Sequence, residues 1–237
     1  MIYGMSDIHG CYEQYKELLG KIHFSDNDLL YVLGDVVDRG PEPMAILKDM
    51  SMRPNVIPLI GNHEYMALSV LKKLCLENTL ENIDKYLDLD LVESFQYWSG
   101  DGGAVTLEQF CKLSSDDREY MLEYLEDFQL YEEFVCNGKR YVLVHADIAG
   151  EDKDRDLDTM GVEDLIFTRA DYTKKYSDHY YLVTGHTPTF KIGPEYTGSI
   201  YRKNNHIAID CGCVAGNRLG VYCFDTEECI YSSKFQK

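Results

Sequence analysis

The sequence predicts a mixed α/β and α+β fold in which two stacked β-sheets carry helices on their outer faces. Two patterns and the composition lead to this prediction. Strand, polar loop and helix alternate three times between residues 1 and 76, whereas the chain from residue 130 onward is rich in short apolar strands. Hydrophobic residues make up 45% of the 237 residues, which is enough for a sizeable core.

The chain is expected to form a single domain over residues 1–237, because its composition shows no break and no linker rich in proline, glycine or serine. Residues 77–128 are predicted to form a helical insertion in this domain. The insertion begins with an acidic, leucine-rich stretch from Glu77 to Leu91, which is typical of a helix with a solvated face.

A formal net charge of -18 argues against nucleic acid as a partner, because such binding depends on lysine and arginine side chains that neutralise phosphates. One small phosphate site is still compatible with it, since bound metal ions can reverse the local field. The sequence shows no signal-peptide pattern and no apolar run of membrane-spanning length. We therefore expect a cytoplasmic protein with no membrane partner, whose eight cysteines are reduced and mostly packed as small hydrophobic residues.

The first predicted strand, Ile2 to Met5, runs directly into a polar loop that holds Asp7 and His9. Side chains alternate along an extended chain, so these two point to the same side at a spacing that suits one metal ion. Taken alone, such a pair is more often a polar strand end. A helix over Cys11 to Ile22 follows from the helical spacing of its apolar residues.

The second unit is the centre of the sequence pattern. A predicted buried strand from Leu29 to Leu33 is followed by two carboxylates and a guanidinium, namely Asp35, Asp38 and Arg39. Asp35 can offer oxygens to a metal ion, Asp38 can orient a neighbouring side chain, and Arg39 can bind a phosphate with its fork of N–H groups. A helix is predicted from residue 41 to about residue 50.

The third unit places Asn62 and His63 between an apolar strand, Asn55 to Ile60, and a helix, Tyr65 to Leu76. Asn62 supplies an oxygen ligand, and His63 can donate a proton because imidazole titrates near neutral pH. Asp38 is expected to accept a hydrogen bond from the His63 ring and to hold its tautomer.

Residues 97–103 contain the only tryptophan and two consecutive glycines, which indicate either backbone near a ligand or a sharp turn; a flexible loop with a structural turn is predicted there. Helices are predicted on its C-terminal side, over Leu107 to Leu113 and Ser115 to Phe128. The second of them begins with a Ser-Asp-Asp run that is suited to capping.

The second half begins with a predicted hairpin over residues 130–145, whose turn is Asn137-Gly138. His145 ends this hairpin, and His186 follows the apolar strand over residues 180–184. Each histidine alone is as much a structural residue as a ligand, but their matching positions favour ligands. Further strands are predicted at residues 206–210, 219–224 and 229–234.

The strand-end residues form a set of oxygen and imidazole donors without a thiolate, which suits manganese, iron or zinc. Six ligands are too many for one catalytic ion with open positions, so two divalent ions bridged by Asp35 are predicted. Arg39 and Arg169 are expected to neutralise phosphate oxygens, and His63 to protonate the leaving oxygen. The implied chemistry is hydrolysis of a phosphate ester. The predicted ligands are Asp7, His9, Asp35, Asn62, His145 and His186.

Five motifs in order resemble those of the metallophosphoesterases of the phosphoprotein phosphatase type, and the bacterial and phage branch is the most similar. They are Asp7-Ile8-His9-Gly10, residues 34–40 with Asp35, Asp38 and Arg39, Gly61-Asn62-His63-Glu64, His145-Ala146-Asp147, and Gly185-His186. The resemblance implies a calcineurin-like fold, which is a four-layer β-sandwich flanked by helices with a dinuclear metal site at its strand ends.

The resemblance also implies a role for each matching residue. One metal ion would be held by Asp7, His9 and Asp35, and the other by Asp35, Asn62, His145 and His186. His63 would be the general acid, paired with Asp38. The substrate phosphate would be bound by Arg39, Arg169, Asn62 and His63.

The expected function is metal-dependent phosphomonoester hydrolysis with a metal-activated water, by a serine/threonine or dual-specificity protein phosphatase. The expected partner is a phosphorylated protein or a small phosphorylated compound, and the expected cofactor is a pair of divalent ions, Mn²⁺ before iron or zinc. One alternative is a symmetrical diadenosine tetraphosphate hydrolase, which has nearly the same motifs. A second is a noncatalytic phosphoprotein-binding module, against which the full ligand set, His63 and Arg39 argue.

Overall fold

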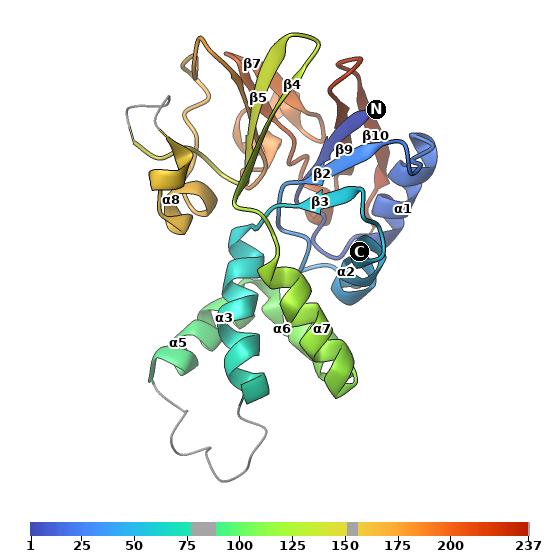
Figure 1. Ribbon diagram of the computed structural model, residues 1–237, viewed down its shortest axis with the longest axis vertical. Helices are drawn as coiled ribbons and strands as arrows, with labels where there is room; N and C mark the ends of the chain where they lie inside the picture. Colours follow the sequence, from blue (N-terminus) through green and yellow to red (C-terminus); the bar gives the residue numbers. More distant parts are fainter. Residues whose placement is uncertain (77–88, 151–155, 237) are drawn as a thin grey trace.

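The computed structural model describes residues 1–76, 89–150 and 156–236, and it contains two five-stranded mixed sheets with helices around them (Figure 1). The first sheet has the order β10-β9-β1-β2-β3, in which β1, β2 and β3 run parallel. Its strands are β1 (Ile2–Met5), β2 (Leu29–Val32), β3 (Val56–Pro58), β9 (Arg218–Cys223) and β10 (Cys229–Lys234).

The second sheet has the order β4-β5-β6-β8-β7, in which β5, β6 and β8 run parallel. Strands β4 and β5 form the predicted hairpin around Asn137-Gly138. The strands of this sheet are β4 (Tyr131–Cys136), β5 (Lys139–Val144), β6 (Tyr181–Thr184), β7 (Tyr201–Lys203) and β8 (His206–Ala208). The short strand β7 was not predicted from the sequence.

The α-helices are α1 (Tyr12–Lys21), α2 (Pro43–Ser51), α3 (Asn62–Leu76), α5 (Leu89–Trp98), α6 (Ala104–Cys111), α7 (Ser115–Glu126) and α8 (Val162–Ile166). A wide helical turn, η1 (Ser99–Gly103), joins α5 to α6. Short 3₁₀ turns are η2 (Leu157–Thr159), η3 (Thr189–Lys191), η4 (Pro194–Tyr196) and η5 (Cys213–Ala215). Within the described ranges, no helix is both long and apolar enough to cross a membrane.

Alternation of side chains along the strands sends the two faces of each sheet into different cores. In β2, Leu30 and Val32 pack with apolar side chains of α1 and α2, whereas Tyr31 points toward the other sheet. In β5, Tyr141 and Leu143 lie in the core between the sheets, and the intervening residues pack toward α8. The layers are therefore helices, sheet, sheet and helix, which confirms the predicted fold class.

The helices between β3 and β4 cluster beside one end of the sheets (Figure 1). Their buried side chains, including Val70, Trp98 and Leu125, belong to the same core as the outer face of the first sheet. Of the predicted acidic stretch, residues 77–88 lie outside the described residues, and residue 89 begins α5. The interpretation of residues 77–128 as an insertion in a single domain stays a prediction.

Two local predictions were wrong. Residues 97–103 are not a flexible loop, because they complete α5 and form η1, which packs against the strand-end loops. Helix α3 begins at Asn62 rather than Tyr65, so Asn62 and His63 belong to its first turn. In both places, contacts with residues distant in the sequence decide a conformation that glycine and polar residues leave open locally.

Candidate metal centre

Loops that follow parallel strands of both sheets meet at one place. The N–H of Asp7, after β1, donates to the carbonyl of Gly34, after β2, over 3.0 Å. His145 Nδ1, after β5, lies 2.6 Å from the carbonyl of Leu33. The N–H of His186, after β6, donates to Asp7 Oδ2 over 2.9 Å. Strand-end residues of the two sheets therefore face a common centre.

Backbone strain is concentrated in these loops. Eleven non-glycine residues of the described chain have positive φ, and more than half of them are predicted site residues. Such conformations cost about 1–3 kcal/mol each and persist only where surrounding contacts enforce them. The residues concerned are Asp7, His9, Asp35, Asp38, Arg39 and His186.

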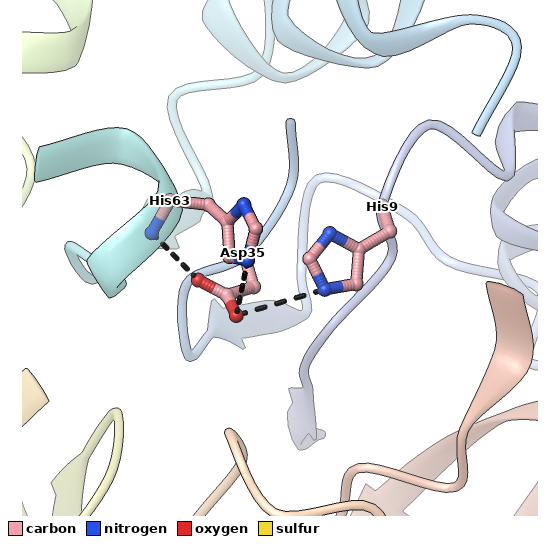
Figure 2. A group of neighbouring side chains, drawn as sticks. All are labelled: His9, Asp35 and His63. Carbon is pink, nitrogen blue, oxygen red and sulfur yellow. Dashed lines mark hydrogen bonds and ion pairs between the residues drawn. The ribbon is translucent and has the colours of Figure 1, made fainter. Parts of the chain in front are cut away.

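Asp35 lies at the middle of the centre, buried, with its two carboxylate oxygens facing different histidines. Oδ2 is 3.6 Å from His9 Nε2 and 4.0 Å from His63 Nε2, as Figure 2 shows. Oδ1 is 3.4 Å from His145 Nε2. Burial opposes the charge of Asp35, but His145 and His63 outweigh it and hold the pKa of the carboxyl well below its usual range. This arrangement is compatible with the bridging role predicted for Asp35.

On the Oδ1 side of Asp35, the side chains of Asn62, His145 and His186 converge. Asn62 Oδ1 is 3.0 Å from His145 Nε2 and 2.9 Å from His186 Nδ1. Burial lowers the pKa of His145, but the Asp35 carboxylate outweighs this effect and raises the pKa to about 10. Burial and the neighbouring His145 lower the pKa of His186 to about 3. The rings of His145 and His186 together therefore carry one positive charge. A metal cation bound between them would supply a positive charge at the same place.

On the Oδ2 side, His9 has the tautomer that a metal ligand needs. Its Nδ1 is 2.8 Å from the carbonyl of Val37, which can only accept, so Nδ1 carries the hydrogen. Burial lowers the pKa of His9 to about 3, so the ring is neutral, and the lone pair of Nε2 accepts from Arg39 Nη1 over 2.9 Å.

The described residues contain two groups of three side chains whose ligand atoms lie within 4.8 Å of one another. They are His9, Asp35 and His63, and Asp35, His145 and His186. The groups share Asp35, as the two predicted sites do, but the first contains His63, the predicted proton donor, in place of the predicted ligand Asp7. The donor set therefore fits two divalent cations, with oxygen and imidazole ligands and one shared carboxylate.

Asp7 lies outside both groups, in contrast to its predicted place beside His9 and Asp35. Its Oδ2 accepts hydrogen bonds from the Ser6 hydroxyl over 2.5 Å and from the N–H of His186 over 2.9 Å. Burial and the adjacent Asp210 raise the pKa of Asp7 well above its usual range. Asp7 stays a predicted ligand whose carboxylate is held here by protein donors.

His63 and Asp38 form the predicted pair, with 2.7 Å between His63 Nδ1 and Asp38 Oδ2. Burial lowers the pKa of His63, but Asp35 and Asp38 together outweigh burial and raise it. His63 Nε2 is buried and has no hydrogen-bond partner among the described residues. The ring thus offers one nitrogen to Asp38 and turns the other toward the centre.

The two arginines lie at the rim of the centre, and both are exposed. Arg39 Nη1 is 2.9 Å from His9 Nε2. Arg169 Nη1 donates to Thr187 Oγ1 over 2.9 Å, one residue beyond His186. A groove of about 390 Å³ opens beside Arg39 and is lined by Asp7, His9, Arg39, Pro188, Phe190, Lys191, Asp210, Gly212, Cys213, Val214 and Ala215.

Glu64, which sequence reasoning did not single out, holds the loop of Asp35. Its carboxylate is fully buried and accepts the N–H groups of Asp35 (2.8 Å), Val36 (2.7 Å), Val37 (3.1 Å) and Gly61 (2.9 Å). A side chain at Gly61 would put a Cβ 2.3 Å from Asp35 Oδ1, so only glycine fits there. In the sequence, the position of Glu64 directly after Asn62-His63 could have indicated that it belongs to the centre.

Asp210 was also missed, although it follows β8 as His145 follows β5. It is buried, its Oδ1 accepts the N–H of Gly212 over 2.8 Å, and burial raises its pKa to about 6. The strand-end rule that selected the other residues would have found it. A further acidic group beside Asp7 adds to the negative potential of the centre.

Two more missed residues come from the helices between β3 and β4. The carboxylate of Asp38 accepts hydrogen bonds from Trp98 Nε1 over 2.8 Å and from the Thr106 hydroxyl over 2.6 Å. Trp98 and Thr106 stand 60 and 68 positions away from Asp38 along the chain. Sequence patterns carry no signal for contacts of that range.

Residues 1–212 match the model of a protein family that is described as "Calcineurin-like phosphoesterase". The chain belongs to the calcineurin-like phosphoesterases. The resemblance stated from the motifs is confirmed. The two groups of ligand atoms agree with the divalent metal ions that this family of metallophosphoesterases uses.

Among its relatives, this phosphoesterase is 26% identical over 213 residues to serine/threonine-protein phosphatase 2 of Salmonella typhimurium, covering 78% of this chain and 87% of that protein. It is 39% identical over 89 residues to the symmetrical bis(5'-nucleosyl)-tetraphosphatase of Buchnera aphidicola, covering 36% of this chain and 32% of that protein. The match therefore spans about a third of the length of that tetraphosphatase.

Solved structures show the same fold. A crystal structure described as a candidate diadenosine tetraphosphatase superposes with a TM-score of 0.67 at 18% identity, covering 100% of this chain and 94% of that one. A serine/threonine phosphatase of Saccharomyces cerevisiae superposes with a TM-score of 0.59 at 13% identity, covering 100% and 80%. At these identities the likeness concerns the fold alone.

Proposed function

We propose that this phosphoesterase is a serine/threonine or dual-specificity protein phosphatase that removes phosphate from phosphorylated proteins. The observation that carries the phosphatase chemistry is the placement of Asp35 between two groups of histidines, with Arg39 and His63 at the same centre. A protein substrate is supported by the relative that is matched over most of its length, which is a protein phosphatase. The strong negative charge of the chain speaks against nucleic acid as its partner.

Two divalent ions, for which Mn²⁺ is the first choice, are proposed as cofactors. One would be held by Asp7, His9 and Asp35, and the other by Asp35, Asn62, His145 and His186. Such a pair lowers the pKa of a water molecule and neutralises charge on the phosphoryl oxygens. Glu64 would hold the Asp35 loop in place for both ions.

The protein's own groups would bind the phosphate and move a proton. Arg39 and Arg169 at the rim would bind the phosphoryl oxygens with their N–H groups, with Asn62 and His63 closer to the centre. As water oxygen adds to phosphorus, the bond to the seryl or threonyl oxygen breaks. His63 would donate the Nε2 proton to that leaving oxygen, while Asp38 holds Nδ1.

Symmetrical cleavage of diadenosine tetraphosphate is the second candidate. It is supported by the higher identity, over a shorter stretch, to relatives named as symmetrical tetraphosphatases. Both reactions use the same centre, so the substrate has to be decided by measurement.

The deciding experiment uses the manganese-loaded protein with Asp35→Asn as the blank. Phosphate release is measured from a phosphoserine peptide, and ADP formation from diadenosine tetraphosphate, at matched concentrations. A higher kcat/KM for the peptide is expected. A higher kcat/KM for the dinucleotide would overturn the proposal in favour of the second candidate. Activity on neither substrate would contradict both and support a phosphoprotein-binding module.

A further inference from the structure

The turn η1 is bonded to Arg39 through both its backbone and its side chain. The N–H of Arg39 donates to the carbonyl of Gly102 over 3.1 Å. The guanidinium donates twice to Asp101, from Nε to the main-chain carbonyl over 3.3 Å and from Nη2 to Oδ1 over 2.9 Å. The exposed side chain of Arg39 is thus fixed along its length.

The backbone of η1 is shaped to lie against Arg39. Gly102 has φ of +103, and a Cβ there would stand 2.6 Å from Arg39 Cγ and 3.1 Å from Arg39 N. Arg39 itself has φ of 65. The positive φ of Gly102 and its close approach to Arg39 both require glycine there, and the strained backbone of Arg39 adjoins it, which indicates that the contact is specific.

These bonds decide which N–H groups of Arg39 remain for a ligand. Asp101 occupies the edge formed by Nε and Nη2, and Nη1 donates to His9 Nε2, which would release Nη1 for a phosphate once that nitrogen binds a metal ion. A free arginine side chain loses about 2 kcal/mol of rotamer entropy when it is ordered. If Asp101 orders this side chain in advance, the entropic cost of binding a phosphate is lower, and the direction from which the phosphate approaches Arg39 is fixed.

The carboxylate of Asp101 also lies near the centre, with Oδ2 3.4 Å from His63 Nε2. It could therefore act as a competing anion that a phosphate must displace. The main-chain carbonyl bonds from Asp101 and Gly102 argue against this role, because a competing anion needs only the carboxylate. The contacts instead hold the arginine from the side away from His9.

We propose that Asp101 is a positioning residue, which aims the guanidinium of Arg39 at the phosphate of the substrate. The inference rests on the proposed function, in which Arg39 binds that phosphate. It adds a role for the segment around residue 101, which the sequence predicted to be a structural turn.

The test measures binding of inorganic phosphate to the manganese-loaded protein by isothermal titration calorimetry. Asp101→Ala removes the acceptor that fixes Nη2, and we expect the dissociation constant to rise roughly tenfold. Asp101→Asn keeps an acceptor oxygen at Oδ1 and should restore most of the affinity. On the phosphopeptide, Asp101→Ala should raise KM more than it lowers kcat.

Two further variants serve as references. Asp178→Ala removes the same charge from an exposed ion pair with Lys175, outside the centre, and should leave phosphate affinity unchanged. Arg39→Ala should weaken phosphate binding at least as much as Asp101→Ala. Circular dichroism spectra and unfolding midpoints would show that each variant is folded.

Unchanged or tighter phosphate binding by Asp101→Ala, with weak binding by Arg39→Ala, would overturn the positioning role alone. Equal weakening by Asp101→Asn and Asp101→Ala would also overturn it, because the charge rather than the held geometry would then matter. Normal binding by Arg39→Ala would show that the proposed phosphate role of Arg39 is wrong, and this inference would fail with it.

Discussion

Asp38 and His63 are examples of titratable side chains that are buried at the carboxyl ends of the parallel strands, whereas at the opposite end of β5 a charged cluster is partly exposed and paired. Asp38 and His63 are 0% exposed in the first region. In the second, Lys139 begins β5 and pairs with Glu227, which also pairs with Arg202, and the three side chains are 34–41% exposed. One end of the sheets therefore keeps charge away from water, and the other end leaves it hydrated.

The difference has an energetic meaning. Burying an ionised group is unfavourable unless other charges and hydrogen bonds compensate it. At the carboxyl ends, Glu64 accepts four backbone N–H groups and Asp38 accepts from His63, Trp98 and Thr106, and the loops of Asp35 and Asp38 are strained as well. The exposed cluster around Glu227 needs no such support. Substitutions should therefore change activity at the first end, and at the second end should change stability slightly.

The largest effect is expected for Asp35→Asn. Its two oxygens face both groups of histidines, so loss of the charge should weaken both metal sites together. We expect phosphatase activity to fall more than about 10³-fold and bound manganese to decrease at both sites. Phosphate release and metal content by mass spectrometry measure the two effects. Retention of a tenth of the activity would contradict the bridging role.

His63→Asn should follow, with a loss that depends on the leaving group. A seryl oxygen needs a proton as it leaves, so the phosphopeptide should lose about 10²–10⁴-fold in kcat. An aryl phosphate such as p-nitrophenyl phosphate has a better leaving group and should lose less. Comparable losses on both substrates would rule out proton donation by His63.

Glu64→Gln should have a smaller effect, because it acts through the loop of Asp35. Glutamine replaces one carboxylate oxygen by an NH₂ group, which cannot accept the backbone N–H groups now bonded to it. We expect manganese affinity to fall about 10–100-fold. The matched control is Glu133→Gln, in an exposed pair with Arg140, whose manganese titration should equal that of the unaltered protein. Wild-type affinity in Glu64→Gln would show that the loop holds without it.

The smallest effect is expected for Glu227→Gln at the opposite end of the sheets. Exposed ion pairs contribute about 0–1 kcal/mol, so the free energy of unfolding in urea should decrease by no more than about 1 kcal/mol. Phosphatase activity should not change. A large loss of activity would mean that the two ends of the sheets are coupled and would break the contrast between them.

Much of the fold follows from local sequence. Continuous apolar runs define β2 and β5, and the Asn137-Gly138 turn sets the hairpin of β4 and β5, because apolar runs and turn chemistry act over a few residues. The clustering of Asp35, His63 and His145 was also predictable, since polar residues followed successive parallel strands, and such strand ends meet at one edge. The assignment of individual ligands, Asp7 among them, stays a prediction.

Other features depend on contacts between segments far apart in the chain. The hydrogen bonds of Trp98 and Thr106 to Asp38, and of Asp101 to Arg39, span 60 to 68 residues and turn a glycine-rich stretch into an ordered part of the centre. The sequence by itself determined most of the strands, β7 excepted, and most of the side chains at their ends, because apolar patterns and turn residues act locally. Only the tertiary structure decided how those side chains are held, because buried polar groups take their partners from whichever segment packs beside them.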